Sequence, residues 1–437
     1  MSNADRVPEA TTPEETGASP AGAQAGAARA DGHTKKHHRM TQAEVRKAAT
    51  PRRGAMYGAM MLMATSAIGP GFLTTTSVFT VQMGASLAFA IMVSILVDIA
   101  IQLNVWRVLG VSGLRANELG NAVLPYLGWI LGALVFLGGL AFNMGNIAGA
   151  GLGLNAMLGL DPIIGGGLAA VIAVLVFISR RAGVALDRIV VVLGAIMVLV
   201  MLYVAVVSAP PVGEALKNTV MPEEIDGVVI TTLIGGITFA GAHRMIDSGY
   251  TGPENVGEIT KTSVLGIIVT GVMRILLFLA VLGVVATGVA LSEDNTAADA
   301  FQHAAGEIGL RFFGVVLFSA GLTSVIGASY TSVSFVTSQE TSQATRSWLT
   351  IAFIAVCAVG YLLLGKGPQQ LLIFAGAFNG LILPIGFTIV GWVAWRRRDL
   401  LHGQAYPKWL LILGALAWIF TVYLGVFTFS DIVALWG

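Results

Sequence analysis

The segment MMLMATSAIGPGFLTTTSVFTVQ, residues 60–82, decides how the rest of the chain is interpreted. An apolar helical pattern runs into Gly69, Pro70 and Gly71 and then becomes rich in hydroxyl groups. Because Pro70 has no amide hydrogen and its ring clashes with the preceding turn, a helix here is expected to kink or unwind. A break within a membrane span is costly unless the freed backbone groups face protein, water or a ligand. The segment therefore predicts a binding site at the break.

The composition predicts a membrane protein. Of 437 residues, 55% are hydrophobic and only 11% are charged, and the mean hydropathy is +0.80. A soluble protein would carry roughly 25% charged residues. A net charge of +1 indicates no nucleic-acid partner, and the single cysteine, Cys357, excludes a disulfide or a thiol-cluster metal site within the chain. The partners that remain are the lipid bilayer and a small ion or molecule.

Residues 1–53 form a region of different composition, rich in Ala, Gly and Pro and ending in a basic run at residues 33–39. The region has no apolar core of a signal peptide, so we predict a disordered cytoplasmic tail beside an anionic membrane leaflet. The transporter domain is expected to follow at residues 54–436.

Apolar runs long enough for a bilayer of about 30 Å predict about eleven membrane helices. We expect them near residues 55–80, 84–107, 123–148, 162–179, 185–208, 228–248, 263–290, 309–335, 347–365, 369–395 and 408–435. Lys and Arg gather in alternate loops, and acidic residues gather in the others. This bias predicts a plasma-membrane protein with its N-terminus in the cytoplasm and its C-terminus outside.

The sixth expected span repeats the feature of the first. An apolar half, residues 230–239, leads into Ala240 and Gly241, and polar residues follow. Two interrupted helices five spans apart are typical of inverted-repeat transporters, whose substrate site lies between the two breaks. We therefore predict an all-α membrane protein with a LeuT-like 5+5 inverted repeat. Repeat one would cover residues 54–208, repeat two residues 228–396, and an extra helix residues 408–436.

Ionisable residues inside membrane spans are costly, so each is a candidate functional group. Arg274 lies near the middle of the seventh span, and Asp98 lies in the second. They could form a structural ion pair or serve coupling and substrate binding, and Asp247 is the second candidate partner of Arg274. His243 and Asp247, one turn apart, could relay protons or line a wet vestibule.

Uncharged polar residues supply the other candidates. Asn143 and Asn146 share a helix face and, like Asn379, could give neutral oxygens to a cation or join helices together. Hydroxyl groups of Thr74 and Thr75 could face the break or bond to their own helix. Together with Gly69, Gly71, Ala240 and Gly241, these residues form the expected substrate site, and no certain metal ligand or cofactor is predicted.

Several motifs resemble the Nramp family of divalent-metal transporters. They are the Gln-Met-Gly-Ala-Ser stretch at residues 82–86 with Ile-Gln at 101–102, the Ala-Phe-Asn-Met-Gly-Asn helix at 141–155, residues 319–329, and Leu-Pro at 383–384. The resemblance covers roughly residues 54–430 and implies the fold of that family. It also implies where the metal ligands would lie.

The chain departs from the family at those ligand positions. The Asp-Pro-Gly-Asn of the family's first helix is replaced by residues 69–72, Gly-Pro-Gly-Phe, and the Met-Pro-His of its sixth helix by residues 240–242, Ala-Gly-Ala. The acidic pair of its third helix, used for proton movement, is replaced by Asn143 and Asn146. With the thioether absent and oxygen donors left, a hard ion such as Mg²⁺ would fit better than Mn²⁺ or Fe²⁺.

Three functions remain open from the sequence. The first is a monomeric secondary transporter for a small cation, with Mg²⁺ preferred. The second is a transporter for an amino acid or another small organic solute, because the Gly-Pro-Gly break resembles the helix start that holds a carboxylate in amino-acid transporters. The third is a membrane sensor that no longer transports. The chain shows no nucleophile–base pattern and no phosphate loop, so we expect neither an enzyme nor an ATP-driven pump.

Overall fold

The computed structural model describes residues 68–178, 196–235, 240–247, 249–337, 341–365 and 367–435, and its regular elements in these ranges are all helices. The long helices are α4 (Leu87–Ser112), α6 (Leu127–Leu158), α12 (Val256–Ala286), α13 (Thr296–Val336), α14 (Gln343–Leu364), α15 (Pro368–Arg396) and α16 (Lys408–Phe427). The shorter ones are α3 (Pro70–Met83), η1 (Gly84–Ser86), α5 (Ala116–Val123), α7 (Pro162–Ile178), α9 (Val212–Val220), α10 (Gly227–Ile234), α11 (Ala240–Asp247), η2 (Pro253–Asn255) and α17 (Phe429–Ala434).

The helices agree with the expected membrane spans where the two can be compared. Among the described residues, seven helices are long and apolar enough to cross a bilayer, and the bent pair Ile196–Val207 and Val212–Val220 adds an eighth candidate. The shorter apolar helix α7 and the pair α10 and α11 fall on the fourth and sixth expected spans. Residues 1–67, which hold the expected tail and the first half of span one, lie outside the described ranges. The prediction of an all-α membrane protein is confirmed.

Helix ends differ from the expected ones at two places. The helix α6 runs ten residues past the expected end of the third span and stops where Gly159 adopts a positive φ of 72° and Asn155 Nδ2 donates to the carbonyl of Leu160. The helix α13 begins at Thr296, where the side chain of Asn295 accepts from Ala298, and is kinked at Gly306. Hydropathy alone misses both ends because capping groups set them.

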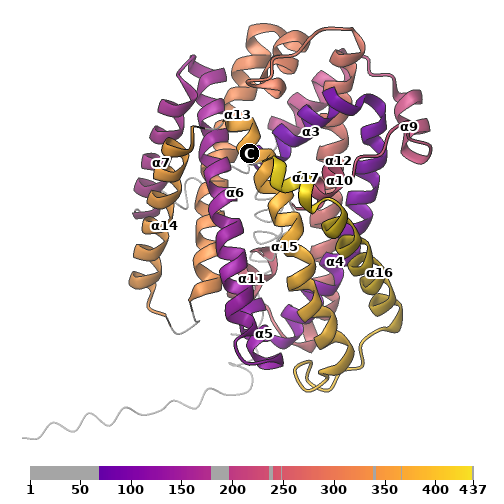
Figure 1. Ribbon diagram of the computed structural model, residues 1–437, viewed down its shortest axis with the longest axis vertical. Helices are drawn as coiled ribbons and strands as arrows, with labels where there is room; N and C mark the ends of the chain where they lie inside the picture. Colours follow the sequence, from indigo (N-terminus) through magenta and orange to yellow (C-terminus); the bar gives the residue numbers. More distant parts are fainter. Residues whose placement is uncertain are drawn as a thin grey trace, which may run out of the picture. The chain divides into compact units, whose positions relative to one another are not determined.

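The helices α6 and α13 pack against each other along their lengths. A Cβ added at Gly153 would lie 2.3 Å from the backbone nitrogen of Phe318, so only glycine permits this approach. The helices α7 and α14 cover the outer side of this pair and share an apolar core with it. In Figure 1 these four helices form one side of the bundle. The pair α6 and α13 therefore gives a rigid wall to whatever lies on its inner side.

The helix α15 connects this wall to the other helices. It contacts α6, α3, α10 and α4, and it lies between α6 and α4 in Figure 1. The helix α16 is fastened to α4 by Asn104, whose Nδ2 donates to the carbonyl of Leu410 and whose Oδ1 accepts from the Tyr406 hydroxyl at 2.7 Å. The bundle thus has two sides, and α3 and α15 lie between them.

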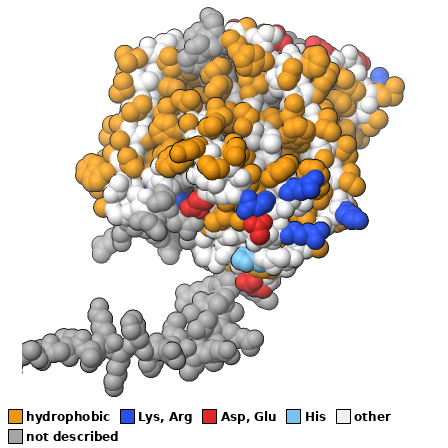
Figure 2. Space-filling view, turned by 60° about the horizontal axis from the view of Figure 1, so that its bottom comes forward, with side chains coloured by type: hydrophobic (Ala, Val, Ile, Leu, Met, Phe, Trp, Pro, Cys, Tyr) orange, Lys and Arg blue, Asp and Glu red, His pale blue; other side chains and the backbone are white. Residues whose placement is uncertain are grey.

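The surface of the bundle is that of a membrane protein. Apolar side chains cover most of the face seen in Figure 2, and charged side chains gather near its edges. Large exposed apolar residues include Trp129, Trp395, Trp409 and Leu363. Such a surface is stable in contact with lipid, whereas a soluble monomer rarely exposes so large an apolar area.

Candidate functional site

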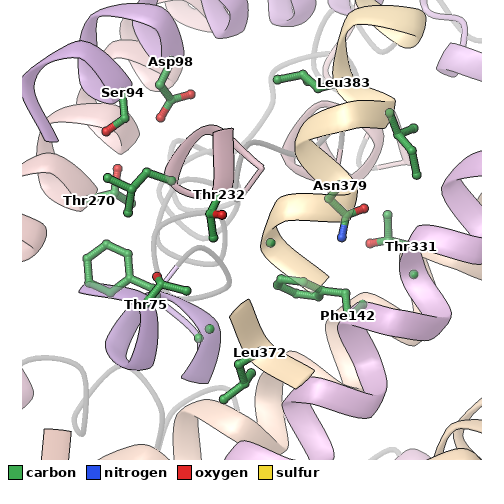
Figure 3. A pocket seen from close by; sticks show the side chains of 18 of the residues that line it. Thr75, Ser94, Asp98, Phe142, Thr232, Thr270, Thr331, Leu372, Asn379 and Leu383 are labelled. Carbon is green, nitrogen blue, oxygen red and sulfur yellow. The ribbon is translucent and has the colours of Figure 1, made fainter. Parts of the chain in front are cut away.

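A cavity of about 150 Å³ lies between the two sides of the bundle. Side chains and backbone of α3, α4, α6, α10, α12, α13 and α15 line it. Figure 3 shows Asp98 and Ser94 of α4 at one side, with Asn379 and Leu383 of α15 across from them and Thr232 of α10 between. Elements from both expected repeats meet at this cavity, as a transporter site requires.

The helix α3 begins at the cavity wall. Pro70 is its first residue, and Gly69, which lines the cavity, is its N-cap with an extended backbone. Proline is well suited to this position because it has no amide hydrogen to satisfy and its φ is fixed near the helical value. No side chain caps the helix, so the amides of Gly71 and Phe72 have no helical acceptor within the described ranges. The positive end of the α3 dipole is therefore directed at the cavity.

Asp98 and Arg274 both line the cavity without making a direct ion pair. The Arg274 guanidinium lies over the Phe72 ring, with its Cζ 4.8 Å from the ring centroid, and its Nη1 lies 3.3 Å from Ser94 Oγ and 3.4 Å from the Leu233 carbonyl. Its Nε and the Oδ1 of Asp98 have no hydrogen-bond partner among the described residues. The two charges offset each other across the cavity, and each keeps an atom available for a ligand.

The remaining polar groups of the cavity are uncharged. They are hydroxyl groups and one amide, from Thr75, Ser94, Thr232, Thr270, Thr331, Ser332 and Asn379. Several are already engaged, because Thr232 Oγ1 donates to the Val228 carbonyl and Asn379 Nδ2 to the Ala375 carbonyl. No group of three or more His, Cys, Asp and Glu side chains among the described residues could hold a metal ion. The cavity therefore offers one carboxylate rather than a cluster of anionic ligands.

A second group of polar side chains lies behind the start of α3, outside the cavity lining. Asn143 and Asn146 of α6 are fully buried, and Asn143 Nδ2 donates to Ser329 Oγ of α13 at 2.8 Å. Neither polar atom of Asn146 has a partner within the described part of the chain, and the same holds for the hydroxyl of Ser324 on α13. A Cβ added at Gly69 would lie 2.7 Å from Ser324 Oγ and 3.7 Å from Asn146 Oδ1. Both side chains therefore face the residue that precedes α3.

The C-terminal part of α13 borders the cavity and contacts α5 and α11. Phe335, which lines the cavity, stacks on the His243 ring with centroids 4.4 Å apart. His243 Nε2 accepts from the Ala116 amide at 3.0 Å, and Asn117 Nδ2 donates to the Phe335 carbonyl at 2.9 Å. Because Nε2 accepts, this nitrogen carries no proton in this geometry. These bonds join α13 to α5 and α11.

The predicted site residues separate into groups. Gly69, Gly71, Thr75, Asn379, Asp98 and Arg274 line the cavity, whereas Thr74, Asn143, Asn146 and His243 are buried outside its lining. Residues 236–239, at the expected second break, and the side chains of Ala240, Gly241 and Asp247 lie outside what the structure describes. The helix α10 ends at Ile234 and α11 starts at Ala240, so the sixth span is built from two separate helices.

Several residues that line the cavity were not predicted from the sequence. Ser94 precedes Asp98 by one helical turn, so helical spacing could have found it. Thr270 precedes Arg274 in the same way. Phe72, Phe142 and Phe335 gave no signal, because an aromatic residue in a membrane span more often packs in the core or against lipid. Ser324 was part of a quoted motif, but its lack of a partner is visible only in three dimensions.

Comparisons with solved structures identify the fold. A manganese transporter from Eremococcus coleocola, solved as a mutant, superposes with a TM-score of 0.68 at 15% sequence identity, over 88% of each chain. The protein MhsT, solved in complex with L-phenylalanine, superposes with a TM-score of 0.63 at 16% identity, over 84% of this chain and 97% of MhsT. At such identities the likeness establishes a shared LeuT-like fold and leaves the substrate open.

Comparisons of sequence identify closer relatives. The membrane protein YcsG of Bacillus subtilis is 47% identical over 380 residues, which is 85% of this chain and 93% of that protein. A membrane protein of Haemophilus influenzae is 45% identical over 391 residues, covering 88% of this chain and 97% of that protein. The family model described as natural resistance-associated macrophage protein-like matches residues 60–431, the whole region from the first break to the last helix. The chain is therefore a membrane transporter that belongs to the Nramp family.

Proposed function

We propose that this transporter is a secondary active carrier of a small organic solute, which it binds in the cavity between α3, α4, α12 and α15. The observation that carries the proposal is the charge of the cavity wall. Arg274 contributes one fixed positive charge, Asp98 contributes one negative charge, and no further ionisable side chain among the described residues lines the cavity. A site of balanced charge suits an uncharged, zwitterionic or singly charged organic molecule.

A divalent metal ion meets an electrostatic obstacle in the same cavity. At an effective dielectric constant of about 20, a guanidinium about 6 Å away opposes each unit of positive charge by about 3 kcal/mol. A single carboxylate already offset by that guanidinium compensates poorly for the hydration that the ion loses. Mg²⁺ also dehydrates reluctantly and is usually held by carboxylates together with several waters.

Transport of a hard divalent cation is the second candidate, with Mg²⁺ preferred over Mn²⁺ and Fe²⁺. It is supported by membership of the Nramp family, by the manganese transporters of the same fold, and by the unpartnered Oδ1 of Asp98 among the described residues. In this case the metal would bind Asp98 together with hydroxyl and amide oxygens. Arg274 would then have to move away from the ion.

We also propose that the basic end of the bundle faces the cytoplasm. Arg397 Nη1 donates to the Ala122 carbonyl, so the basic loop after α15 lies against the end of α5. Glu223 and Glu293 belong to loops at the other ends of the helices. The positive-inside tendency then gives a cytoplasmic N-terminus, an outside C-terminus and a plasma-membrane location. The cavity is formed within one chain, so transport needs no second copy.

Uptake into proteoliposomes that contain the purified full chain tests the proposal. We expect uptake of at least one member of a labelled panel of amino acids and small organic acids, in amounts well above those of empty vesicles. Uptake of Mg²⁺ or Mn²⁺ without uptake of any organic solute would overturn the proposal in favour of the second candidate. No uptake in either arm would support a membrane sensor instead.

A further inference from the structure

We infer that the carried solute bears a carboxylate, and that Asn146 of α6 and Ser324 of α13 donate hydrogen bonds to this carboxylate at the start of α3. The inference rests on the proposed function and names the chemical class of its substrate. It also assigns a role to two side chains that lie outside the cavity lining and take no part in the structural hydrogen bonds described above.

Two buried polar side chains near the start of α3, Asn146 and Ser324, have no hydrogen-bond partner among the described residues. Asn146 is 0% exposed and Ser324 is 1% exposed, yet neither amide atom of Asn146 and no atom of the Ser324 hydroxyl has a partner among the described residues. A buried polar group without a hydrogen-bond partner destabilises the folded protein. The serine and threonine residues next to Ser324 avoid this cost, because Ser319 and Thr323 bond to carbonyls of their own helix. Other buried side chains of the described residues, such as Thr76, Ser208 and Ser263, also lack a partner, but Asn146 and Ser324 both lie against Gly69, and a ligand that joins them explains this pair.

The side chains of Ser324 and Asn146 are both directed at the start of α3. Ser324 and Asn146 approach the Gly69 backbone from two different helices, at 2.7 and 3.7 Å from the position a Cβ would take. No side chain caps α3 at its N-cap Gly69, and the amides of Gly71 and Phe72, which follow it, have no acceptor among the described residues. Four polar groups therefore converge on one end of a 14-residue helix. Two are side chains that lack partners in the described part of the chain, and two are backbone amides.

The electrostatic potential at the start of α3 is positive. The helix start carries a partial positive charge, and Arg274 is close by because its guanidinium lies over Phe72. The serine hydroxyl can donate, and a half-turn of the Asn146 amide directs Nδ2 rather than Oδ1 toward the same point. The negatively charged Asp98 belongs to α4, on the other side of the cavity. A group of donors with positive potential selects an anion, and backbone amides at a helix start bind carboxylates and phosphates readily.

The surroundings of the anion site indicate which kind of anion would bind there. Gly71 lies beside Leu372 and Phe142, with contacts of 3.8 and 3.9 Å from its would-be Cβ, so the anion site opens onto an apolar part of the cavity. An inorganic anion would leave this apolar surface and the cavity volume of about 150 Å³ to water. A carboxylate attached to a small organic body fills both. A small organic carboxylate is therefore the ligand that matches the whole site.

Thermal unfolding of the full chain in nanodiscs, recorded with a panel of ligands, tests the inference. The panel contains small organic carboxylates and amino acids, their uncharged amides, sodium chloride and inorganic phosphate. We expect some carboxylates to raise the unfolding temperature in a saturable way, and their amides to have no effect. Stabilisation by inorganic anions alone, or by amides as well as by acids, would overturn the inference.

Two variants test the assigned donors. Ser324→Ala removes a hydroxyl that has no partner among the described residues, so we expect unchanged or higher stability without ligand. The affinity for carboxylates should fall about 10-fold, since a hydrogen bond to a charged group contributes about 1.5–3 kcal/mol. Asn146→Asp replaces a donor by a negative charge of the same shape and is expected to lower the affinity at least about 100-fold. Ser319→Ala, on the same helix, is the matched control and should leave the affinity unchanged.

The outcomes separate this inference from the proposed function. If an organic solute is transported but no transported solute needs its carboxylate, the inference fails and the proposed function stands. If no organic solute is transported, the proposed function fails. If carboxylates bind and Ser324→Ala has the affinity of the unaltered protein, with Asn146→Asp still binding, the site assigned to the carboxylate is wrong.

Discussion

The two sides of the cavity differ in how they treat polar groups. On the α4 and α12 side, the ionisable side chains of Asp98 and Arg274 line the cavity, and their charges offset each other when Asp98 is ionised. On the α6 and α13 side, Asn146 and Ser324 are neutral and have no partner among the described residues. The first arrangement makes the net charge of the site close to zero, and the second leaves donors free at a helix start. Under the proposed function, the charged pair would determine which solutes are excluded, and the neutral pair would bind the solute.

Replacement of Arg274 should have the largest effect on this comparison. Arg274→Met leaves Asp98 as an uncompensated buried charge, which typically costs about 3–5 kcal/mol, so we expect lower stability and loss of transport. Thermal unfolding and solute uptake measure the two effects. The double variant Arg274→Met with Asp98→Asn removes both charges and should recover most of the stability without recovering transport. Full transport at normal abundance in Arg274→Met would contradict the role assigned to the charged side.

A methyl group at Gly69 should have the next largest effect on stability and solute affinity. It would lie against Ser324, on the α6 and α13 side of the cavity. In Gly69→Ala the new Cβ would lie 2.7 Å from Ser324 Oγ, and such overpacking costs about 1–3 kcal/mol. The double variant Gly69→Ala with Ser324→Ala removes the close contact, so we expect it to regain stability while solute affinity stays low. Gly167→Ala, where no atom lies within 4 Å of the added Cβ, is the control. An affinity for solute unchanged by Gly69→Ala would show that the start of α3 is not a binding element.

Two threonines that line the cavity should differ in a smaller way. The Thr75 hydroxyl has no hydrogen bond to other described residues, whereas Thr232 Oγ1 is engaged with the carbonyl of Val228 at 2.7 Å. We therefore expect Thr75→Val to lower solute affinity about 3- to 10-fold, as the loss of one neutral hydrogen bond would. Thr232→Val should change it less than about 2-fold. If Thr75→Val and Thr232→Val lowered the equilibrium affinity equally, the lack of a hydrogen bond at a hydroxyl would not determine whether that hydroxyl contacts the solute.

The smallest effect on transport is expected far from the cavity. Tyr406→Phe removes the hydrogen bond to Asn104 that holds α16 against α4, and the free energy of unfolding should fall by about 1 kcal/mol. Uptake should stay at the level of the unaltered protein. A loss of uptake without a loss of stability would indicate that α16 takes part in the transport cycle.

Much of the fold could be predicted from the sequence, because a membrane helix must consist of about 20 apolar residues. The apolar runs therefore locate the spans, and the pattern at Gly69, Pro70 and Gly71 locates a helix start at the cavity. The ends of α6 and α13 could not be found in this way. They depend on capping by Gly159 and Asn295 and on a kink at Gly306, which are local backbone effects that hydropathy does not report.

The site could be predicted only in part. Asp98 and Arg274 were found because a charge in a membrane span is rare, and both line the cavity. A direct ion pair, one of the two roles left open for them, is not formed, because the guanidinium lies over Phe72 and reaches Ser94 and the Leu233 carbonyl instead. The sequence could not separate Asn143 from Asn146. The first is bonded to Ser329 and the second has no partner among the described residues, and this difference depends on contacts with α13.

Equilibrium titration of the purified full chain tests the central claim, that a cavity of balanced charge holds an organic solute rather than a metal ion. Isothermal titration calorimetry with Mg²⁺, with Mn²⁺ and with the small organic carboxylate that stabilises the protein most would compare the candidates in one sample. We expect saturable binding of the carboxylate that is lost in Arg274→Met, and no binding of either metal at the same concentrations. Saturable binding of Mg²⁺ or Mn²⁺ that depends on Asp98, with no heat from any carboxylate, would contradict it.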